Sequence, residues 1–246
     1  MSAPQLRCSN LGMSTITTPP ASLEVFRNGR RVPTDLWQGE TPPRAILLAC
    51  HGGSGHKRSR AIVAIAQAAV PLGLAVLAID GPVHGERRAD GDLTPQTAIA
   101  AFRQAWREGV GRDDMARDFS AALDVLVARP MYQGVPVGYV GVSMGTAYGL
   151  ALLAREPRIG AAVIGLWGTN YAASSHLPAL AGQVRCPVWF TQQWDDEIFD
   201  RAGTFELFDA LGSENKRLVA YPGPHRELEG QRLDEALAFL VRQLAG

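Results

Sequence analysis

The sequence lacks the usual marks of a nucleic-acid, disulfide-rich or metal-binding protein. Its 246 residues hold 24 Lys and Arg against 24 Asp and Glu, so the net charge is zero and there is no basic footprint for nucleic acid. The three cysteines, Cys8, Cys50 and Cys186, are scattered and have neither disulfide nor metal-ligand spacing. We therefore expect no nucleic-acid partner, no metal or other cofactor, and a reducing, cytoplasmic setting.

Long hydrophobic runs are also missing. Residues 1–20 have no continuous apolar stretch behind a basic start, so no secretory signal is expected there. Residues 61–79 have Gln67 as their only polar member, but Pro71 and Gly73 divide them into a helix-sized and a strand-sized piece. We interpret the run as a buried helix, a turn and a buried strand, and expect no membrane partner.

What the sequence does have is an alternation of strand and helix patterns. The hydrophobic fraction of 46% and charged fraction of 20% are ordinary for a globular chain. The patterns predict strands at residues 44–50, 74–80, 136–142, 159–167, 187–193 and 216–221, and helices at residues 60–70, 95–106, 113–128, 147–154, 202–211 and 228–244. This order predicts an α/β fold with a mostly parallel sheet between two helix layers.

The N-terminal part predicts a different local structure. Residues 1–22 are expected to be irregular, and residues 23–246 to form a single domain, because no linker divides them. Asn28-Gly29 lies between residues 23–27 and 31–33, which favours a tight hairpin. This hairpin is expected to add an antiparallel edge to the sheet.

One pentapeptide, Gly141-Val142-Ser143-Met144-Gly145, lies between a predicted strand and a predicted helix. This is the setting that a G-x-S-x-G nucleophile elbow needs. Its glycines leave room for a strained turn that exposes the serine oxygen. The pattern predicts Ser143 as the nucleophile of a serine hydrolase.

A serine nucleophile needs a base and an acid, and in α/β hydrolases the chain order is serine, acid, histidine. Of the five histidines, only His176 and His225 follow Ser143. His225 comes directly after the last predicted strand, where a base loop belongs, whereas His176 precedes the penultimate strand. The order predicts His225 as the base.

The acid should follow the strand at residues 187–193, where the chain reads Trp194-Asp195-Asp196-Glu197. Asp196 is preferred because an apolar residue, Ile198, follows it by two positions, as in the acid loop of many α/β hydrolases. Asp195 remains the alternative, because Gln193 stands where that loop usually has glycine.

An oxyanion hole needs two N–H groups. One is expected from Met144, the residue after the nucleophile. The loop after the first predicted parallel strand reads His51-Gly52-Gly53-Ser54, and we expect the second donor from Gly53, with Ser54 as the alternative. His51 is expected to orient this loop and to take no part in proton transfer.

Together these motifs resemble the α/β-hydrolase superfamily over residues 23–246. The chain is most similar to compact bacterial esterases related to dienelactone hydrolases and acetyl-ester hydrolases. Residues 81–87, Gly-Pro-Val-His-Gly-Glu-Arg, are similar to the D-x-P-x-H-G loop of many members, whose usual role is structural and near the pocket. Dienelactone hydrolases use a cysteine nucleophile, so Ser143 favours ordinary ester chemistry.

The resemblance implies a serine esterase for small or medium carboxylic esters, with a small-molecule ester as its partner. An amidase, peptidase or lactone hydrolase with the same triad is the alternative, and a non-catalytic receptor on this fold is a remote one. The short segment at residues 168–186 implies a minimal lid, while the sequence leaves open whether residues 81–112 cover the pocket. Candidate pocket walls are Trp106, Trp167, Tyr171, His176 and Trp194.

Overall fold

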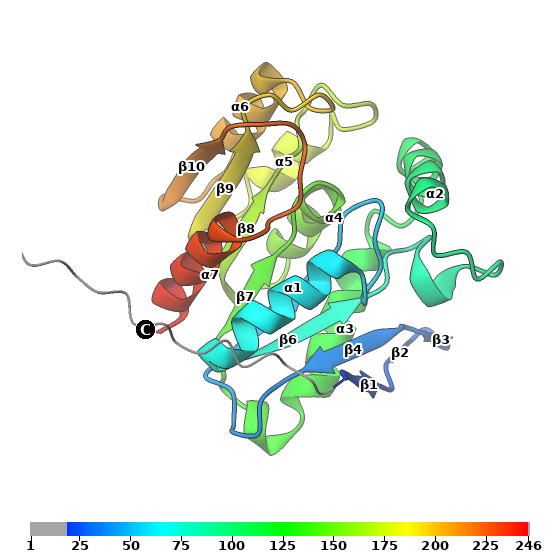
Figure 1. The fold of residues 1–246 in the computed structure, drawn as a ribbon, viewed down its shortest axis with the longest axis vertical. Helices are drawn as coiled ribbons and strands as arrows, with labels where there is room; N and C mark the ends of the chain where they lie inside the picture. Colours follow the sequence, from blue (N-terminus) through cyan, green and yellow to red (C-terminus); the bar gives the residue numbers. More distant parts are fainter. Residues whose placement is uncertain (1–18, 246) are drawn as a thin grey trace, which may run out of the picture.

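The computed structural model describes residues 19–245, and a twisted sheet of eight strands runs through its centre (Figure 1). The sheet order is β1-β4-β6-β5-β7-β8-β9-β10. The strands are β1 (Ala21–Leu23), β4 (Thr34–Trp37), β5 (Ala45–Ala49), β6 (Leu74–Ile79), β7 (Val137–Val140), β8 (Ile159–Gly165), β9 (Val188–Gln193) and β10 (Lys216–Tyr221).

The six strands from β5 to β10 pair in parallel, whereas β4 pairs antiparallel with both β6 and β1. Every residue of β5, β6 and β7 is buried. Continuous apolar runs of this kind are typical of parallel strands that are covered on both faces. The predicted mostly parallel sheet with an antiparallel N-terminal edge is confirmed.

The predicted hairpin forms at Asn28-Gly29. Strands β2 (Phe26–Arg27) and β3 (Arg30–Arg31) pair antiparallel in a small sheet of their own. The turn residues have φ of 52° and 73°, the left-handed values that a type I′ turn requires and that Asn and Gly tolerate best. The antiparallel edge of the large sheet is made by β1 and β4, which precede and follow this hairpin.

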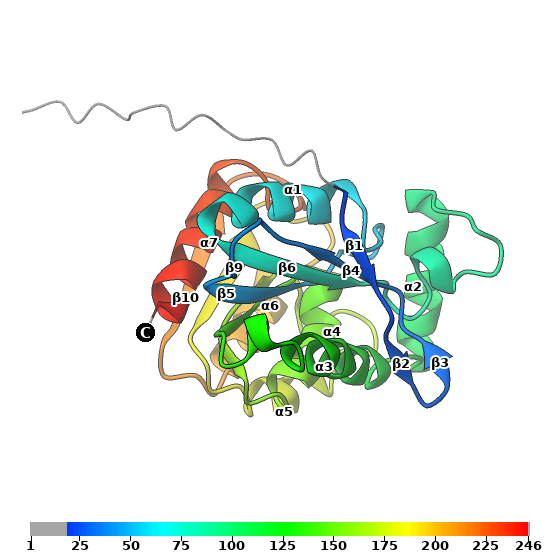
Figure 2. The ribbon, with the colours of Figure 1, turned by 90° about the horizontal axis from the view of Figure 1, so that it is seen from below.

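Helices cover both faces of the sheet, as Figure 2 shows from below. Helices α1 (Arg60–Ala69) and α7 (Gln231–Leu244) bury their apolar stripes on one face. Helices α3 (Asp114–Val127), α4 (Met144–Leu153), α5 (Leu177–Ala181) and α6 (Arg201–Asp209) pack on the other. Helix α2 (Pro95–Glu108) lies beyond the strand ends, and its Phe102 and Trp106 join the hydrophobic core on the face that α3 to α6 cover. Short 3₁₀ turns occupy Val70–Leu72, Gly85–Arg87 and Pro130–Tyr132.

Two helices differ from the prediction. Helix α7 begins at Gln231 and not at residue 228, because Gly230 has a φ of 53° that ends the preceding loop. Leu228 is buried in that loop and joins the core without being helical. Helix α5, only five residues long, was not predicted.

Among the described helices, none is both long and apolar enough to cross a membrane. The irregular start expected for residues 1–22 lies mostly outside the described residues.

The carboxyl ends of the parallel strands meet at one edge of the sheet. The loops that follow β5, β6, β7, β9 and β10 therefore come together there, and in open α/β sheets this edge is where ligands bind. All the residues predicted to carry chemistry lie on these loops or at the start of α4.

Candidate active site

Ser143 lies in a sharp turn between β7 and α4. Its backbone has φ of 57° and ψ of −122°, an unfavourable conformation for a residue with a Cβ atom. Its N–H donates to the Gly165 carbonyl at 2.9 Å, and its own carbonyl accepts the N–H of Thr146 at 2.8 Å. The turn is thus held from both sides, with Ser143 as the N-cap of α4.

The two glycines of the pentapeptide are required by close packing. A Cβ atom on Gly141 would lie 2.7 Å from the Tyr139 hydroxyl and 2.9 Å from Cys50 Cβ. A Cβ atom on Gly145 would lie 3.2 Å from the Cys50 carbonyl oxygen. A side chain at Gly141 would therefore clash with Tyr139 and the residue after β5, and one at Gly145 would fit only if its neighbours moved slightly.

His225 and Asp196 form a direct pair. His225 Nδ1 lies 2.8 Å from Asp196 Oδ2. The other oxygen, Oδ1, accepts the N–H groups of Ile198 at 2.8 Å and Phe199 at 2.9 Å. Burial raises the pKa of the Asp196 carboxyl, but the hydrogen bonds from His225 and from the two N–H groups outweigh it and leave the pKa below its usual value. Asp196 is therefore an anion that can orient the His225 ring.

The acids on either side of Asp196 bond to the backbone of the loop after β10 and not to the His225 ring. Asp195 Oδ2 accepts the N–H of Gly223 at 3.2 Å, and the Asp195 N–H donates to the Gly223 carbonyl at 3.1 Å. Glu197 Oε2 accepts the backbone N–H of His225 at 2.8 Å. These bonds tie the loop after β9 to the loop after β10, and the carboxylate bonded to the His225 ring is that of Asp196.

The two expected oxyanion donors come from different elements. Met144 is the first residue of α4, where N–H groups have no partner within the helix and the helix dipole is positive. Gly53 lies in the loop after β5, and its carbonyl lies 3.0 Å from His84 Nε2. His51 is buried behind this loop, with Nδ1 2.8 Å from the Gly52 carbonyl and Nε2 accepting the Gly81 N–H at 2.9 Å.

A cavity of about 210 Å³ brings most of these residues together. It contains Ser143, His225 and both candidate residues of the loop after β5, while Asp196 lies behind His225. The full lining consists of Gly53, Ser54, Ile99, Phe102, Arg103, Ser143, Trp167, Tyr171, Ile198, Phe199, His225, Arg226 and Glu227. Its aromatic wall is continuous, because Trp167 lies 4.6 Å from Phe199 and 4.7 Å from Tyr171 between ring centroids.

Of the five candidate wall residues, Trp167 and Tyr171 line this cavity. Trp106 is fully buried behind Trp167, 5.3 Å away between centroids, and its Nε1 donates to the Ala172 carbonyl. His176 packs on Trp106 at 5.5 Å and lines a separate surface hollow with Arg112. Trp194 is 46% exposed and carries the guanidinium of Arg201, 4.5 Å from its ring centroid.

Several lining residues escaped the sequence analysis. Ile99, Phe102 and Arg103 come from α2, so part of the segment at residues 81–112 forms a wall of the cavity. The other four, Ile198, Phe199, Arg226 and Glu227, follow Asp196 or His225 within three positions. Their closeness in sequence to the predicted acid and base was a usable signal.

Glu227 is the one acidic side chain in the lining. Its Oε1 lies so near the loop after β5 that a Cβ atom on Gly52 would be 2.3 Å from it. Burial raises the pKa of the Glu227 carboxyl, and the charge of His225 partly offsets that effect.

Within residues 19–245, no group of three or more His, Cys, Asp or Glu side chains is arranged to hold a metal ion. The groups that the fold assembles here are Ser143, the His225–Asp196 pair and nearby backbone N–H groups. Such a constellation can carry out nucleophilic acyl transfer.

The sheet order, the strained serine between β7 and α4, and the acid and histidine after β9 and β10 define an α/β-hydrolase fold. The family model of the dienelactone hydrolase family matches residues 51–225. The chain belongs to the dienelactone hydrolase family, and this membership supports an enzyme of the hydrolase type.

Solved structures agree with this assignment. The chain is 36% identical to a cold-adapted esterase from an Arctic intertidal metagenomic library, over 92% of this chain and 93% of that one, with a TM-score of 0.80. It is 21% identical to the dienelactone hydrolase of Anabaena variabilis, covering 92% of this chain and 97% of that one, with a TM-score of 0.66. It is 16% identical to ferulic-acid-bound Est1E from Butyrivibrio proteoclasticus, covering 91% and 100%, with a TM-score of 0.69. At the two lower identities the likeness shows the fold alone.

Proposed function

We propose that this protein is a serine esterase that cleaves small or medium carboxylic esters through an acyl-enzyme on Ser143. The observation that carries the proposal is the convergence of a strained serine and a histidine paired to a carboxylate on one cavity of about 210 Å³. A serine hydroxyl is a weak nucleophile unless a base within reach takes its proton. The elbow and the Asp196–His225 pair are the parts that such activation needs.

The proposed reaction has two halves. Ser143 Oγ attacks the ester carbonyl while His225 Nε2 takes its proton, and the carbonyl oxygen becomes an oxyanion. His225 then gives the proton to the departing alcohol, which leaves an acyl-enzyme. In the second half, water loses a proton to His225 and attacks the acyl carbon, and Ser143 is released with its proton restored.

Charge stabilisation in both halves is assigned to the N–H groups of Met144 and Gly53. An N–H group positioned before the reaction stabilises the oxyanion without reorganisation, and removing one such donor typically costs about 3–4 kcal/mol. Asp196 would hold His225 in the tautomer with the proton on Nδ1 and stabilise the imidazolium that forms.

Esters are proposed as substrates because the solved structure with 36% identity is an esterase and because Ser143 replaces the cysteine expected of dienelactone hydrolases. The wall of Phe102, Trp167, Tyr171 and Phe199 favours an apolar acyl or alcohol group. We further propose a small-molecule partner, with neither nucleic acid nor membrane bound, and a cytoplasmic setting.

The test is covalent labelling followed by a substrate panel. A fluorophosphonate probe should label the wild-type protein at Ser143 and leave Ser143→Ala unlabelled. The panel should pair p-nitrophenyl esters of two to twelve acyl carbons with a p-nitroanilide and a γ-lactone, with Ser143→Ala as the blank. Turnover of the anilide or lactone above that of every ester would replace the ester assignment. Full ester hydrolysis by Ser143→Ala would disprove the proposed mechanism.

A further inference from the structure

Two buried histidines lie directly behind the proposed oxyanion loop and are not part of the triad. His51 follows β5, and His84 lies in the loop that follows β6. Both are 1% exposed or less, and their rings meet edge to face with 4.8 Å between centroids. Each ring lies within hydrogen-bond distance of a different carbonyl of the loop after β5.

The bonded carbonyls belong to the peptide groups that contain the candidate donors. His51 Nδ1 lies 2.8 Å from the Gly52 carbonyl, and His84 Nε2 lies 3.0 Å from the Gly53 carbonyl. In a planar trans peptide the C=O and N–H bonds point in opposite directions. Holding the Gly52 carbonyl therefore aims the Gly53 N–H, and holding the Gly53 carbonyl aims the Ser54 N–H. A histidine therefore holds the peptide group on each side of Gly53.

The hydrogen-bond partners of the two rings determine which ring nitrogens carry a hydrogen. The Gly81 N–H can only donate, so His51 Nε2, 2.9 Å away, must be an unprotonated acceptor and Nδ1 must carry the hydrogen. The Gly53 carbonyl can only accept, so His84 Nε2 must carry the hydrogen. The His51 ring is therefore neutral. Burial favours the neutral form of both rings, since it lowers the pKa of His51 to about 4 and that of His84 to about 3.

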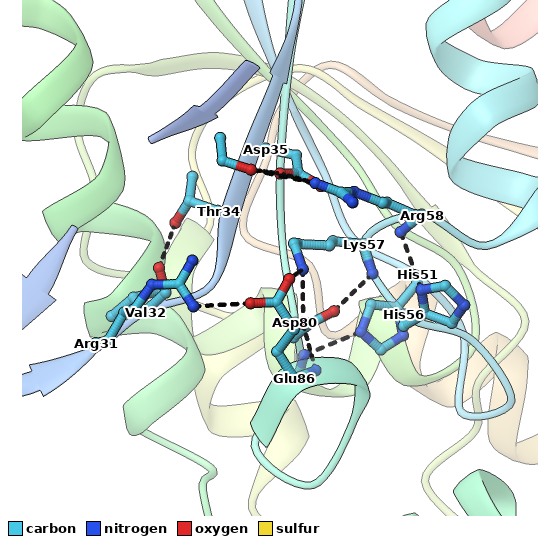
Figure 3. Close-up of polar contacts among 12 residues, drawn as sticks. Arg31, Val32, Thr34, Asp35, His51, His56, Lys57, Arg58, Asp80 and Glu86 are labelled. Carbon is cyan, nitrogen blue, oxygen red and sulfur yellow. Dashed lines mark hydrogen bonds and ion pairs between the residues drawn. The ribbon is translucent and has the colours of Figure 1, made fainter. Parts of the chain in front are cut away.

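Asp80, at the end of β6, ties the two loops to the sheet (Figure 3). Its Oδ1 accepts the Lys57 N–H at 2.8 Å, and its Oδ2 accepts the Glu86 N–H at 2.9 Å. The ammonium of Lys57, itself buried, lies 3.2 Å from the same carboxylate and also pairs with Glu86. The segments that carry His51 and His84 are thus joined at a fully buried anion, which limits how far either ring can move.

We propose that His84 is a positioning residue that, together with His51, sets the direction of the oxyanion N–H groups through the Gly52 and Gly53 carbonyls. This inference rests on the proposed function, because it assigns the loop after β5 to the oxyanion. The histidines do not touch the reacting atoms. His51 holds the peptide group that carries the Gly53 N–H, and His84 holds the next peptide group, so that Gly53 is fixed from both sides in the orientation in which it can donate to the transition state.

Variants at His84 separate this role from simple packing. His84→Gln keeps an N–H donor, His84→Phe keeps a ring of similar size without a donor, and His84→Leu keeps neither. His56→Gln is the matched control, because His56 lies on the loop after β5, near His51, and the one hydrogen bond of its ring within residues 19–245 is accepted from the Arg58 N–H, at 3.2 Å. For each variant kcat and KM for a short p-nitrophenyl ester should be measured, together with the affinity for a trifluoromethyl ketone.

The ketone forms a tetrahedral adduct whose oxygen occupies the proposed oxyanion hole. Ser143 Oγ adds to its carbonyl carbon, the serine proton passes to His225, and the carbonyl oxygen becomes the bound oxyanion. A small misplacement of a catalytic group can lower the rate about a hundredfold. We therefore expect His84→Phe and His84→Leu to lower kcat by about tenfold to a hundredfold, with ketone affinity falling in parallel and KM changing less than about threefold. His84→Gln should restore most of the loss, and His56→Gln should match the wild type.

Several results would overturn the proposal. A folded His84→Phe or His84→Leu protein with kcat within twofold of the wild type would do so, as would a loss of kcat without a loss of ketone affinity. If neither donor-free variant folds, the role of His84 is structural and the proposal is wrong. Fluorophosphonate labelling of wild-type Ser143 is measured first, so failure of the proposed function is seen before any His84 variant is compared.

Discussion

His225 Nδ1 lies 2.8 Å from Asp196 Oδ2, although the two residues are 29 positions apart in the chain. The bond crosses from the loop after β9 to the loop after β10. Two further side-chain bonds between these loops lie beside it: Asp195 accepts the Gly223 N–H, and Glu197 accepts the His225 N–H. The register of the loops is thus set by three acids, of which one faces the imidazole.

This arrangement predicts different effects for two neighbouring substitutions. Asp196→Asn should lower kcat about 10³- to 10⁴-fold, because an amide can stabilise the wrong tautomer of His225 and cannot stabilise its protonated form. Asp195→Asn should change kcat less than about threefold, since its side chain contacts only the Gly223 N–H. Steady-state kinetics on one ester decides between them. A larger loss in Asp195→Asn would move the acid to position 195.

The elbow itself depends on a buried hydroxyl that the pentapeptide motif does not include. Thr146 Oγ1 accepts the Gly165 N–H at 2.7 Å and lies 2.5 Å from the Gly165 carbonyl, which also accepts the Ser143 N–H. Thr146→Val keeps the shape of the side chain but leaves the Gly165 N–H buried without a partner. We expect a loss of about 1–3 kcal/mol in the free energy of unfolding.

Urea unfolding followed by circular dichroism measures this loss, and Thr97→Val is its control. The Thr97 hydroxyl lies at the exposed start of α2, where it bonds to the Thr94 hydroxyl and the Asp92 carboxylate, so its removal should cost no more than about 0.5 kcal/mol. Equal stabilities of the two variants would show that the hydroxyl of Thr146 does not support the elbow.

The pKa values of His51 and His84 predict a loss of stability in acid. Both lie below the usual value of about 6.5, at about 4 and about 3. The unfolded chain therefore binds more protons than the folded chain below pH 6.5. The contribution of these two histidines to the free energy of unfolding should be fully present above that pH. It should fall as the pH drops from about 6.5 toward 4, by up to the order of 3 kcal/mol for each histidine.

Some charged neighbours of the two rings oppose their protonation and others favour it. Lys57, His56 and Arg87 oppose a proton on His51. Arg88 opposes one on His84, while Asp80 favours it. Urea unfolding at pH 7, 6, 5 and 4.5 gives the change in the free energy of unfolding per pH unit. This slope should be smaller in His84→Gln than in the wild type, by up to about 1.4 kcal/mol per pH unit, because the variant has one proton fewer to bind. Identical slopes in the two proteins would mean that His84 is not a buried neutral group.

The core strands and the candidate triad could be predicted because each has a strong local pattern. Strands β5 to β8 are short apolar runs, and the order of Ser143, Asp196 and His225 along the chain leaves few choices. Strand β4 was not predicted because Thr34 and Asp35 are polar, yet both are buried. Asp35 is satisfied by Arg58 and Ser22, a pairing between segments that no local pattern reveals.

The cavity wall was harder to predict than the candidate triad. Phe102 shares the buried face of α2 with Ala98, Ala105 and Trp106, and helical spacing indicates burial without saying what lies opposite. The packing of α2 over the strand ends decides that Phe102 meets the cavity and Trp106 does not. Likewise, His84 was identified only as part of a loop, because its hydrogen bond spans 31 positions to Gly53.

Phe102 should therefore control the size of the acyl group. Its ring fills the space between Gly53 and Trp167, and lies so close to the loop that a Cβ atom on Gly53 would be 2.8 Å from its Cδ1 atom. Phe102→Ala removes this wall without touching Ser143, His225 or Asp196. Since one methylene group in an apolar pocket is worth about 1–3 kcal/mol, the ratio of kcat/KM for an octanoate ester to that for an acetate ester should rise at least about tenfold.

The measurement is the same p-nitrophenyl panel on wild type, Phe102→Ala and Leu93→Ala. Leu93 is 50% exposed and lies outside the cavity lining, so its variant should keep the wild-type ratio. Loss of the Phe102 ring also removes contacts with Trp106 and Tyr148, so assays belong well below the melting temperature of the variant. A ratio unchanged in folded Phe102→Ala would place the acyl group elsewhere, against Trp167 and Phe199 at the other side of the cavity.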